Sequence, residues 1–393
     1  MNICMVAYTF YESDNRIRRY AETLVKRGDS VSVFSLKREG QGSFGVLNGV
    51  EIYRIQERIV NEKGKLSYLY KLLKFFVLST CFLAKEHIKK PYDLIHVHSV
   101  PDFEVFAAVL PKLMGAKIIL DIHDIVPEFY CSKFNTKKDS LIFKCLVLIE
   151  KLSIKFADHT IISNHIWYDT LVSRSVKKEK CTTILNYPDN TLFIKNKKVT
   201  NNDKIIMLYP GTLNWHQGLD IAIKAFARIA EQTPFAEFHI YGDGSSKNDL
   251  EKMVLELGVE NKVFVNGLVS IDEIVSIMSN ADIGIIPKRN DSFGGEAFST
   301  KSLEFMLLGV PIIVSKTKID DYYFNESIVK YFEPESDKEL AVAMLSLIKN
   351  KEERKKLSQN ALNYVAAKNW ESKKTIYINL VNSILPDSNR NVK

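Results

Sequence analysis

Two glutamates in the second half of the chain have the spacing of side chains that bind a polar ligand. Glu296 and Glu304 enclose seven residues in the segment GGEAFSTKSLEFMLLGVPIIV. The pattern predicts a helix over 301–308, with Glu304 on the helix and Glu296 in the loop before it. A loop carboxylate can accept hydrogen bonds from sugar hydroxyls, and a helical carboxylate can bind the two hydroxyls of a ribose. Exposed acids on helices are common, so the spacing alone is weak evidence for a ligand site. The hypothesis depends on the context, because a predicted strand ending at Pro287 lies just upstream.

Two glycine-containing turns follow predicted strands in the same half. Gly211 opens the turn GTLN after strand 204–209, and Gly242 lies in the turn YGDG after strand 236–241. Backbone amides in such a turn can bind phosphate without a charged side chain, and glycine lets a planar base approach the backbone. Each turn alone is equally well explained as a tight connection. With the glutamates, the turns predict three ligand-contacting loops at one edge of a sheet.

In the first half, His123 directly follows the predicted strand 117–122. Ligands of open α/β sheets bind beyond the carboxyl ends of the strands, which favours a site role for this imidazole over a structural one. His96 and His98 alternate with apolar residues on a predicted buried strand, and we interpret both as structural.

Strands and helices alternate through both halves, and this alternation must position the residues above. It predicts an α/β fold of two Rossmann-like, doubly wound parallel-sheet domains, residues 1–190 and 191–370, with the ligand crevice where strand ends face each other. The predicted strands are 2–8, 30–36, 50–55, 93–98, 117–122, 159–163, 204–209, 236–241, 262–266, 283–286 and 311–315. The predicted helices are 15–27, 65–90, 103–114, 140–156, 219–232, 248–257, 271–279, 301–308 and 371–385.

The segment Gly40–Gly45 matches the dinucleotide-binding pattern G-x-G-x-x-G after a predicted strand. Residues 46–55 nevertheless read as turn and strand, so the helix N-terminus that holds a pyrophosphate is missing. We interpret this segment as a plain loop.

Charge is unevenly distributed along the 393 residues, whose net charge is +7. Residues 1–190 contain 28 basic and 21 acidic residues, whereas 191–393 contain 26 of each. The first half is therefore expected to face an anionic partner. The excess is mild and no Arg/Lys stripe is interleaved with aromatic residues, so nucleic acid is not expected as a partner.

The five cysteines form no C-x-x-C pair, so a structural zinc site has no support. Their odd, scattered arrangement is typical of a reducing compartment. The N-terminus MNICMVAYTF has neither the basic region nor the long apolar region of a signal peptide. We expect a cytoplasmic protein.

Residues 65–90 combine apolar residues with flanking lysines. The uncharged stretch Phe75–Ala84 has ten residues, and a membrane-spanning helix needs about 20. One interpretation is a buried amphipathic helix between two strands, which is the more common case. The other is a helix on an anionic bilayer, peripheral at the inner face of the cell membrane. Both hold if one face packs and the basic face contacts lipid.

Together these residues make the chain resemble a retaining glycosyltransferase of family 4, whose architecture is called GT-B. The most specific part is Glu296-x7-Glu304 with the following GVPIIV. Further support comes from 211–220, YGDG, 281–287, MVAYTF and His123, so the resemblance extends over essentially the whole chain. It is greatest to enzymes of bacterial cell-surface polysaccharide (exopolysaccharide) biosynthesis, and it implies a cleft between the domains and a last helix, within 371–393, that crosses back.

The resemblance implies a nucleotide-sugar donor, UDP- or GDP-linked, held by the second domain, and a saccharide or lipid-linked acceptor held by the first. Glu304 would bind the ribose hydroxyls and Glu296 the donor-sugar hydroxyls near the reacting carbon. The amides of Phe298 and Ser299 would lie near the sugar and diphosphate, and His123 would contact the donor sugar. The family uses no metal and the chain has no D-x-D pair, so no metal or other cofactor is expected.

One departure concerns the cations on the diphosphate. The family commonly has Arg and Lys in the loop that here reads GTLNWHQG, at positions occupied by Thr212 and Gln217. Both stay among the expected donor-binding residues, but another cation is needed because stabilising the leaving charge is a major catalytic effect. Lys301, three residues before Glu304, is the main candidate. The other candidates are Lys288, Arg289 and, from the first domain, Arg16.

The family implies transfer by front-face displacement, in which the departing phosphate oxygen accepts the acceptor's proton. Two alternatives use the same architecture, a nucleotide-sugar epimerase and a non-catalytic nucleotide-sugar-binding protein. An epimerase would need additional acids near the ligand. The missing Arg and Lys favour a binding protein, whereas the intact Glu296, Glu304 and His123 oppose it.

Overall fold

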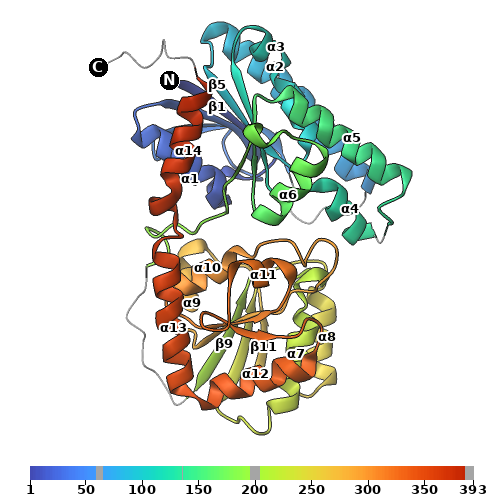
Figure 1. Cartoon of the computed structure of the whole chain (residues 1–393), viewed down its shortest axis with the longest axis vertical. Coiled ribbons are helices and arrows are strands. Elements are labelled where there is room, and N and C mark those ends of the chain that lie inside the picture. The colour runs from blue at the N-terminus through green and yellow to red at the C-terminus, as the bar shows by residue number, and fades with distance from the viewer. Residues whose placement is uncertain (59–64, 135, 195–203, 386–393) are drawn as a thin grey trace. The chain divides into compact units, whose positions relative to one another are not determined.

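The computed structural model describes residues 1–58, 65–134, 136–194 and 204–385, which divide into two compact units (Figure 1). The first unit is Met1–Asn186 with Lys374–Lys393, and the second is Tyr187–Lys373. The chain returns to the first unit within its last helix, α14 (Trp370–Ile384). Each unit has its own largely parallel sheet, which confirms the predicted pair of doubly wound α/β domains.

The first unit is built on an eight-stranded sheet in the order β3-β4-β2-β1-β5-β6-β7-β8. All neighbouring strands are parallel except β3 and β4. The central strands β1 and β5 are buried almost throughout, as expected when helices cover both faces. The strands are β1 (Asn2–Ala7), β2 (Ser30–Lys37), β3 (Phe44–Leu47), β4 (Val50–Glu57), β5 (Leu94–Ser99), β6 (Lys117–Ile122), β7 (His159–Ile162) and β8 (Cys181–Thr183).

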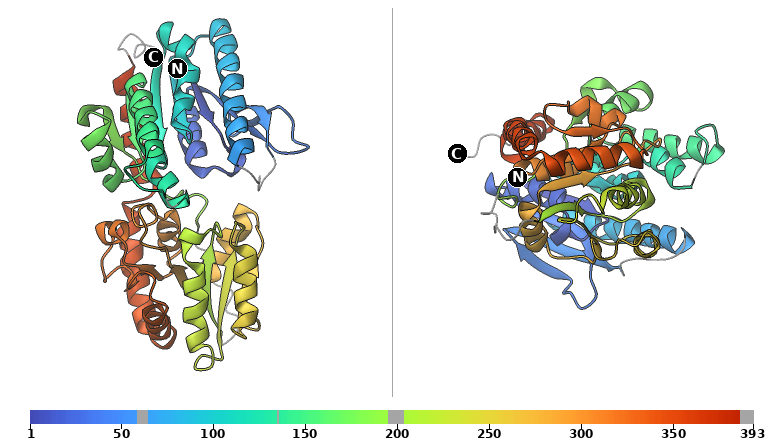
Figure 2. Two further views of the ribbon diagram at one scale, coloured as in Figure 1. Left: turned by 90° about the vertical axis from the view of Figure 1, so that its right-hand side faces the viewer. Right: turned by 90° about the horizontal axis from the view of Figure 1, so that it is seen from below.

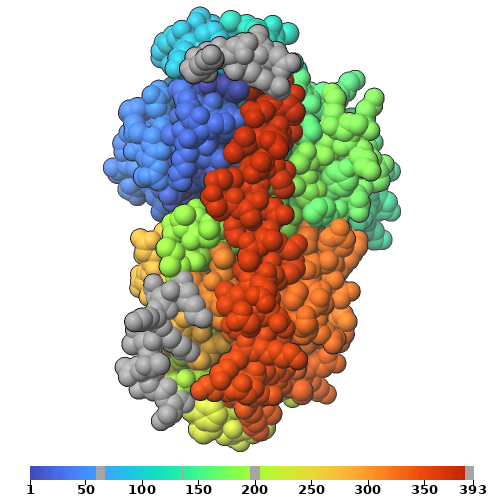
Figure 3. Space-filling model, turned by 60° about the vertical axis from the view of Figure 1, so that its left-hand side comes forward, coloured from blue at the N-terminus to red at the C-terminus, as the bar shows by residue number. Residues whose placement is uncertain are grey.

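Helices cover both faces of this sheet. α1 and α14 lie side by side on one face (Figure 3). The rings of Tyr20 and Tyr377, one from each helix, have centroids 4.2 Å apart. α2, η2, α3 and α5 share the other face, because η2 packs against both α2 and α5 (Figure 2). The helices are α1 (Asn15–Lys26), α2 (Lys65–Lys89), α3 (Val109–Leu113), α4 (Val126–Phe134), α5 (Leu141–Phe156) and α6 (His165–Arg174), with 3-10 turns η1 (Tyr11–Ser13), η2 (Asp102–Ala108) and η3 (Lys178–Lys180).

Helix α1 shows how local sequence delivers a side chain to the sheet edge. The side chain of Asp14 caps the helix by accepting hydrogen bonds from the amides of Arg16 and Ile17 at 3.1 and 3.2 Å. The helix ends before Gly28, whose φ of 99° suits glycine. Arg16 in the first turn therefore reaches Asp121 on β6.

The hairpin β3–β4 was not predicted, although Asn48-Gly49 is a favoured two-residue hairpin turn. Both residues have positive φ, 51° and 80°. No helix follows Gly40–Gly45, and the next elements are β3 and β4. The interpretation as a loop holds for residues 40–43 but is wrong for Phe44 and Gly45, which begin β3.

The single helix predicted over 103–114 is wrong, because the chain forms η2 and then the short α3. Pro111 has no amide hydrogen, and its ring would clash with the carbonyl four residues earlier in a continuous α-helix. The α-helical hydrogen bonds therefore begin only at Val109, with the proline in the first turn.

The second unit has a six-stranded, fully parallel sheet in the order β11-β10-β9-β12-β13-β14. A hydrophobic core cluster of this unit joins β9, β10, α7 and α12. The strands are β9 (Ile205–Pro210), β10 (Ala236–Tyr241), β11 (Val263–Asn266), β12 (Ile283–Ile286), β13 (Ile312–Ser315) and β14 (Lys330–Phe332). The helices are η4 (Trp215–Gln217), α7 (Leu219–Ile229), α8 (Lys247–Glu256), α9 (Ile271–Asn280), α10 (Thr300–Leu307), α11 (Lys318–Tyr323), α12 (Asp337–Lys349) and α13 (Lys351–Ala366).

Among the described residues, α2 is the one helix long and apolar enough to cross a membrane, with mean hydropathy 1.3 over Ser67–Lys89. Leu72, Phe75 and Leu83 on one side of α2 are nevertheless buried in the first unit. Only 22% of its most apolar window is buried. The prediction of a buried amphipathic helix is therefore correct for one side of α2. Apolar residues on its other side are exposed.

Glu104 on η2 predicts a pH-dependent stability. It is fully buried and accepts a hydrogen bond from Ser79 on α2. Burial raises its pKa from 4.5 to about 8. The folded protein therefore holds a proton that the unfolded chain releases, and this carboxyl makes folding less favourable as pH rises from about 4.5 to about 8.

We expect Glu104→Gln to raise Tm at pH 8 by a few degrees and to change it little at pH 4.5, because glutamine keeps the acceptor oxygen without the charge. Calorimetry at the two pH values measures the difference. The exposed Glu39→Gln serves as the control and should shift neither value. An equal shift of Tm at both pH values would contradict the assignment.

Candidate functional site

The two glycine turns meet at the carboxyl edge of the second sheet, as the sequence predicted. The amide of Gly211 donates a hydrogen bond to the carbonyl of Tyr241 at 2.8 Å. Gly211 and Gly242 have φ of 137° and 147°. A Cβ on Gly242 would lie 1.8 Å from the carbonyl oxygen of Gly211, so only glycine permits this approach of the two backbones.

Lys301, the predicted replacement cation, lies directly over the first of these turns. A Cβ on Gly211 would come within 2.2 Å of its Cε. Its Nζ lies 5.1 Å from the centroid of the Tyr209 ring, a cation–π contact. Burial lowers the pKa of Lys301 to about 8, and the nearby carboxylate of Glu304 opposes this shift. Within residues 204–385 no carboxylate forms an ion pair with Lys301, so its charge is available to an anionic ligand.

Helix α10 adds uncommitted hydrogen-bond donors beside Lys301. The amides of Phe298, Ser299 and Thr300 make no hydrogen bond among the described residues, as expected at a helix N-terminus. The hydroxyls of Ser299 and Ser302 are buried, also without a partner in the part of the chain that the structure describes. The ring of Phe298 packs against Tyr323 at 4.8 Å, which fixes the loop. Lys301 and these donors together form an anion-binding arrangement.

Both glutamates occupy the predicted elements. Glu304 lies on α10, one turn beyond Lys301, and is half-buried. Glu296 lies in the loop before α10, and its Oε1 is 2.7 Å from Nζ of the exposed Lys318. Neither position tests the ligand roles expected of the two carboxylates, which stay predictions.

Thr212 and Gln217 share one neighbour, the buried hydroxyl of Tyr209. It lies 2.9 Å from the carbonyl oxygen of Thr212 and 3.0 Å from Oε1 of Gln217. Gln217 therefore helps to fix the turn at Gly211, and neither residue supplies the missing positive charge.

Lys288, Arg289 and Arg16, the other candidate cations, each form an ion pair with a carboxylate in the structure. Lys288 is 3% exposed, forms an ion pair with Asp320 at 2.9 Å and donates to the carbonyl of Ala297 at 2.7 Å. It therefore anchors the loop before α10.

The two arginines are also bound to carboxylates. Arg289 donates to both oxygens of Asp220 at 2.7 and 2.8 Å and lies over the Trp215 ring. Arg16 is 4% exposed and donates to both oxygens of Asp121 at 2.7 and 2.9 Å. Buried charges need such partners, so burial commits each cation within its own unit.

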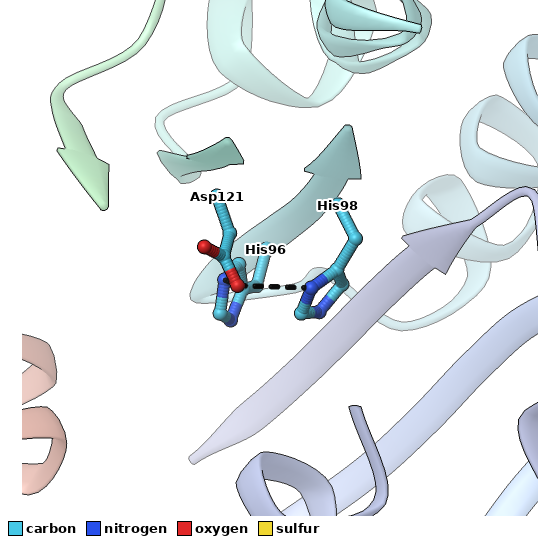
Figure 4. Close-up of side chains that lie close together, drawn as sticks. All are labelled: His96, His98 and Asp121. Carbon is cyan, nitrogen blue, oxygen red and sulfur yellow. Dashed lines mark ion pairs between the residues drawn. The ribbon is translucent and has the colours of Figure 1, made fainter. Parts of the chain in front are cut away.

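A second polar cluster lies in the first unit around Asp121, at the carboxyl ends of β5 and β6. The Oδ2 atom of Asp121 is 3.3 Å from Nδ1 of His98 (Figure 4) and 3.2 Å from Nε2 of His123. His96 stacks on His98 with ring centroids 4.1 Å apart, and its Nδ1 contacts the hydroxyl of Tyr377 at 2.9 Å. His123 is thereby held at the sheet edge by a buried carboxylate.

Charge in this cluster is set by burial and by Arg16. Burial alone would raise the pKa of Asp121, but Arg16 and His123 hold that pKa well below its ordinary value. Burial lowers the pKa of His98 and, further, that of His96, so both imidazoles are neutral near pH 7. The ionised Asp121 can accept a hydrogen bond from Nε2–H of His123, and in that tautomer Nδ1 is the acceptor of the ring.

His98 and His123 line a cavity of about 230 Å³ at this edge of the sheet. Other lining residues are Tyr8, Thr9, Arg58 and Tyr68. Asp124 also lines it, and burial raises the pKa of that carboxyl. Aromatic rings, a guanidinium and carboxyl groups are a suitable lining for a polar ligand of sugar size.

The sequence interpretation missed Asp121 as the centre of this cluster and treated His98 as structural. In the structure β5 and β6 are parallel neighbours, and His98 and Asp121 are partners in the register. Which strands neighbour each other is decided by tertiary packing, so this pairing could not be predicted from the sequence pattern.

His96, His98 and Asp121 have ligand atoms within 4.8 Å of one another, a spacing that could suit a metal ion. Both oxygens of Asp121 already bind Arg16. A divalent cation would compete with the guanidinium for a single negative charge in a buried site. The donor set therefore does not fit a resident metal, and we expect none.

The Arg16–Asp121 pair predicts a large stability effect. Asp121→Asn keeps the shape but leaves the buried Arg16 charge without its counter-charge, and we expect a loss of about 3–5 kcal/mol in the free energy of unfolding. Urea unfolding followed by circular dichroism measures this loss.

The matched control is the double variant Arg16→Met with Asp121→Asn, which removes both charges. It should be more stable than Asp121→Asn alone, because no isolated charge remains buried. If the loss in the double variant equalled the sum of the losses in Asp121→Asn and in Arg16→Met alone, the pair would not be coupled.

Two family models match successive parts of the chain. Residues 14–189 match Glycosyltransferase Family 4, and residues 190–364 match Glycosyl transferases group 1. A relative, the phosphatidylinositol N-acetylglucosaminyltransferase gpi3 subunit of Schizosaccharomyces pombe, is 22% identical over 85% of this chain and 69% of that protein.

Solved glycosyltransferase structures share the fold. Sucrose-phosphate synthase of Thermosynechococcus elongatus matches with a TM-score of 0.78 and 18% identity, over 98% of this chain and all of that one. HepE of Anabaena, solved with UDP and glucose, matches with a TM-score of 0.71 and 16% identity, over 97% and 99% of the two chains. With both parts of the sequence matched by family models, this chain belongs to the glycosyltransferases of the family 4 type with the GT-B fold.

Proposed function

We propose that this enzyme is a retaining hexosyltransferase that moves a sugar from a UDP- or GDP-sugar to a saccharide or lipid-linked saccharide in polysaccharide or other glycan biosynthesis. The observation that carries the proposal is the anion-binding arrangement of Lys301, Gly211 and the first amides of α10 in the second unit. The UDP in the HepE structure supports a nucleotide-sugar donor.

In this proposal the residues of the second unit divide the donor between them. Glu304 on α10 binds the ribose hydroxyls, and Glu296 in the preceding loop binds the donor-sugar hydroxyls. The amides of Phe298 and Ser299 bind the diphosphate. Gly211 and Gly242 let the nucleotide approach the backbone, because no side chain fits there.

Lys301 takes the role of the Arg and Lys that the GTLNWHQG loop lacks. Its ammonium is partly buried and has no carboxylate partner in an ion pair among the described residues, so it can stabilise the charge that grows on the leaving diphosphate. Retention follows from front-face displacement, in which the leaving phosphate oxygen takes the proton from the acceptor hydroxyl. Glu296 binds in this scheme and does not attack.

We propose that the first unit binds sugar in the cavity lined by His98 and His123. We assign His123 to contact with a reacting sugar, oriented by Asp121. The proposal places the enzyme in the cytoplasm, peripheral at the inner face of the membrane, where a lipid-linked acceptor would be found. It includes no metal or other cofactor.

The test is nucleotide release from UDP- and GDP-sugars, with and without a membrane extract as a source of acceptor. We expect nucleotide release to depend on the extract. Radiolabelled sugar should pass into an acceptor, and the transferred sugar should keep the anomeric configuration that it had in the donor. Interconversion of the donor sugar without an acceptor would identify an epimerase. Nucleotide binding without turnover on any donor would identify a binding protein.

Substitution of Glu304 and substitution of Glu296 are predicted to affect different steps. Glu304→Gln should weaken UDP binding about tenfold, because a bidentate carboxylate contact to the ribose is lost. Glu296→Gln should leave UDP affinity within about twofold and lower kcat about 10- to 100-fold.

The ribose assignment has its own control ligand, 2′-deoxy-UDP, measured by calorimetry. The wild type should bind it more weakly than UDP, and Glu304→Gln should bind the two equally. If the variant still discriminates between them, Glu304 does not bind the ribose.

Lys301 predicts a pH profile for nucleotide binding. Its pKa of about 8 in the free protein means that the cation is lost as pH rises through 8. UDP affinity should therefore be highest below pH 8. Above pH 8 it should decrease, by up to about tenfold for each pH unit.

Lys301→Arg should flatten this profile because arginine stays protonated, and Lys301→Met should weaken binding at every pH below 8. Lys316→Met, at an exposed lysine of the same unit, serves as the control and should keep the wild-type profile. A wild-type profile in Lys301→Met would show that another group holds the diphosphate.

A further inference from the structure

Helix α2 presents an apolar stripe to solvent on the side opposite its buried face. Tyr70, Val77 and Ile88 are 65%, 57% and 64% exposed, and Leu73 and Cys81 are exposed with them. At 3.6 residues per turn these positions share one side of the helix.

Helix α5 presents a second stripe of the same kind. Its exposed apolar residues recur at the helical spacing of four, three and four positions, and three exposed lysines follow along one edge of the stripe. The apolar residues are Leu141, Cys145, Leu148 and Leu152, and the lysines are Lys144, Lys151 and Lys155.

The two stripes belong to one face of the first unit. α2 and α5 run alongside each other with α3 between them (Figure 2, left), and η2 packs against both. At α3 and just after it, Leu113 is 81% exposed and Met114 is also exposed, which continues the apolar surface. We call the exposed residues of α2, α3 and α5, together with Met114, the three-helix face.

Charge on the three-helix face has one sign. Lys74, Lys85 and Lys89 are exposed on α2, in addition to the three lysines of α5. The helices contain two acids: Glu86 is paired with Lys89, and Glu150 is buried with Arg174. Every fully exposed charged side chain on α2, α3 and α5 is therefore a lysine.

We propose that the three-helix face binds the surface of an anionic lipid bilayer. Exposed apolar residues would enter the headgroup–acyl boundary while the lysines contact anionic headgroups, the division of labour typical of helices that lie in a membrane interface. A protein partner is less suited to this face, because lysine is depleted at protein interfaces. The six lysines of this face contribute to the basic excess of residues 1–190.

The sugar-sized cavity borders this face. Tyr68, in the first turns of α2, lines the cavity, and its ring lies 6.4 Å from that of Tyr8. Leu69 and Tyr70 follow directly and are exposed. A saccharide attached to a lipid in the bilayer could therefore enter the cavity without leaving the membrane surface. This last step rests on the proposed function, whereas bilayer binding does not.

The test is flotation of the whole chain with vesicles of phosphatidylcholine, alone or with about 30% phosphatidylglycerol. We expect binding to the anionic vesicles, weak binding to the neutral ones, and loss of binding in high salt. The apolar variant is Val77→Ser, Leu113→Ser and Leu148→Ser, and the lysine variant is Lys144→Gln, Lys151→Gln and Lys155→Gln. Each should lower partitioning at least tenfold.

Matched controls come from the second unit, with side chains of similar exposure. The apolar control is Leu255→Ser, Leu268→Ser and Val342→Ser, at positions 67%, 71% and 69% exposed. The lysine control is Lys252→Gln, Lys355→Gln and Lys356→Gln. Both controls should bind vesicles as the wild type does, and all variants should bind UDP unchanged.

Three results would overturn the proposal. They are equal binding to neutral and anionic vesicles, equal loss in the controls and the variants, and a wild-type dimer that becomes monomeric in the apolar variant without any vesicle binding. Failure of UDP binding in the wild type would count against the proposed function alone.

The entry of a lipid-linked saccharide into the cavity has its own test. If the variants lose transfer to a lipid-linked acceptor but keep transfer to a soluble saccharide, this step is supported. Equal loss of both activities would contradict it.

Discussion

The carboxyl ends of parallel strands all lie at the same edge of a sheet, and both polar clusters of this protein depend on that constraint. In the second unit it brings Gly211 and Gly242 into backbone contact and sets α10 beside them. In the first unit it brings His98 and Asp121 together with the loop residue His123. Neither cluster needs a long insertion, because the polar residues simply follow the ends of apolar strands.

Burial decides which charged groups remain available to a ligand. A buried cation must be paired, so Lys288, Arg289 and Arg16 each bind a carboxylate of their own unit. Lys301 is only partly buried and forms a cation–π contact but no ion pair among the described residues, and this partial burial lowers its pKa. Of the four cations that the sequence offered for the proposed diphosphate site, Lys301 alone forms no ion pair among the described residues.

The helices of the first unit show that amphipathic helices need not have a polar outer side. α2 and α5 bury one apolar side against the sheet and expose another, bordered by lysines. Folding alone gives no reason for exposed Leu113 and Leu141, because their burial would be favourable and their exposure has a cost in water. An environment that is itself apolar removes that cost.

The sequence by itself determined the two α/β domains, the places of Glu296 and Glu304 and the convergence of the glycine turns, because hydrophobic periodicity and strand ends are local properties. The hairpin β3–β4 and the break at Pro111 were not predicted, although the sequence contains a local signal for each. These signals are the Asn48-Gly49 turn and the proline itself. Tertiary structure alone decided which strands are neighbours, and hence that Asp121 lies between Arg16, His98 and His123. It also decided which lysines and arginines are committed, since an ion pair joins residues as distant as 16 and 121, and its formation depends on burial that no local pattern encodes.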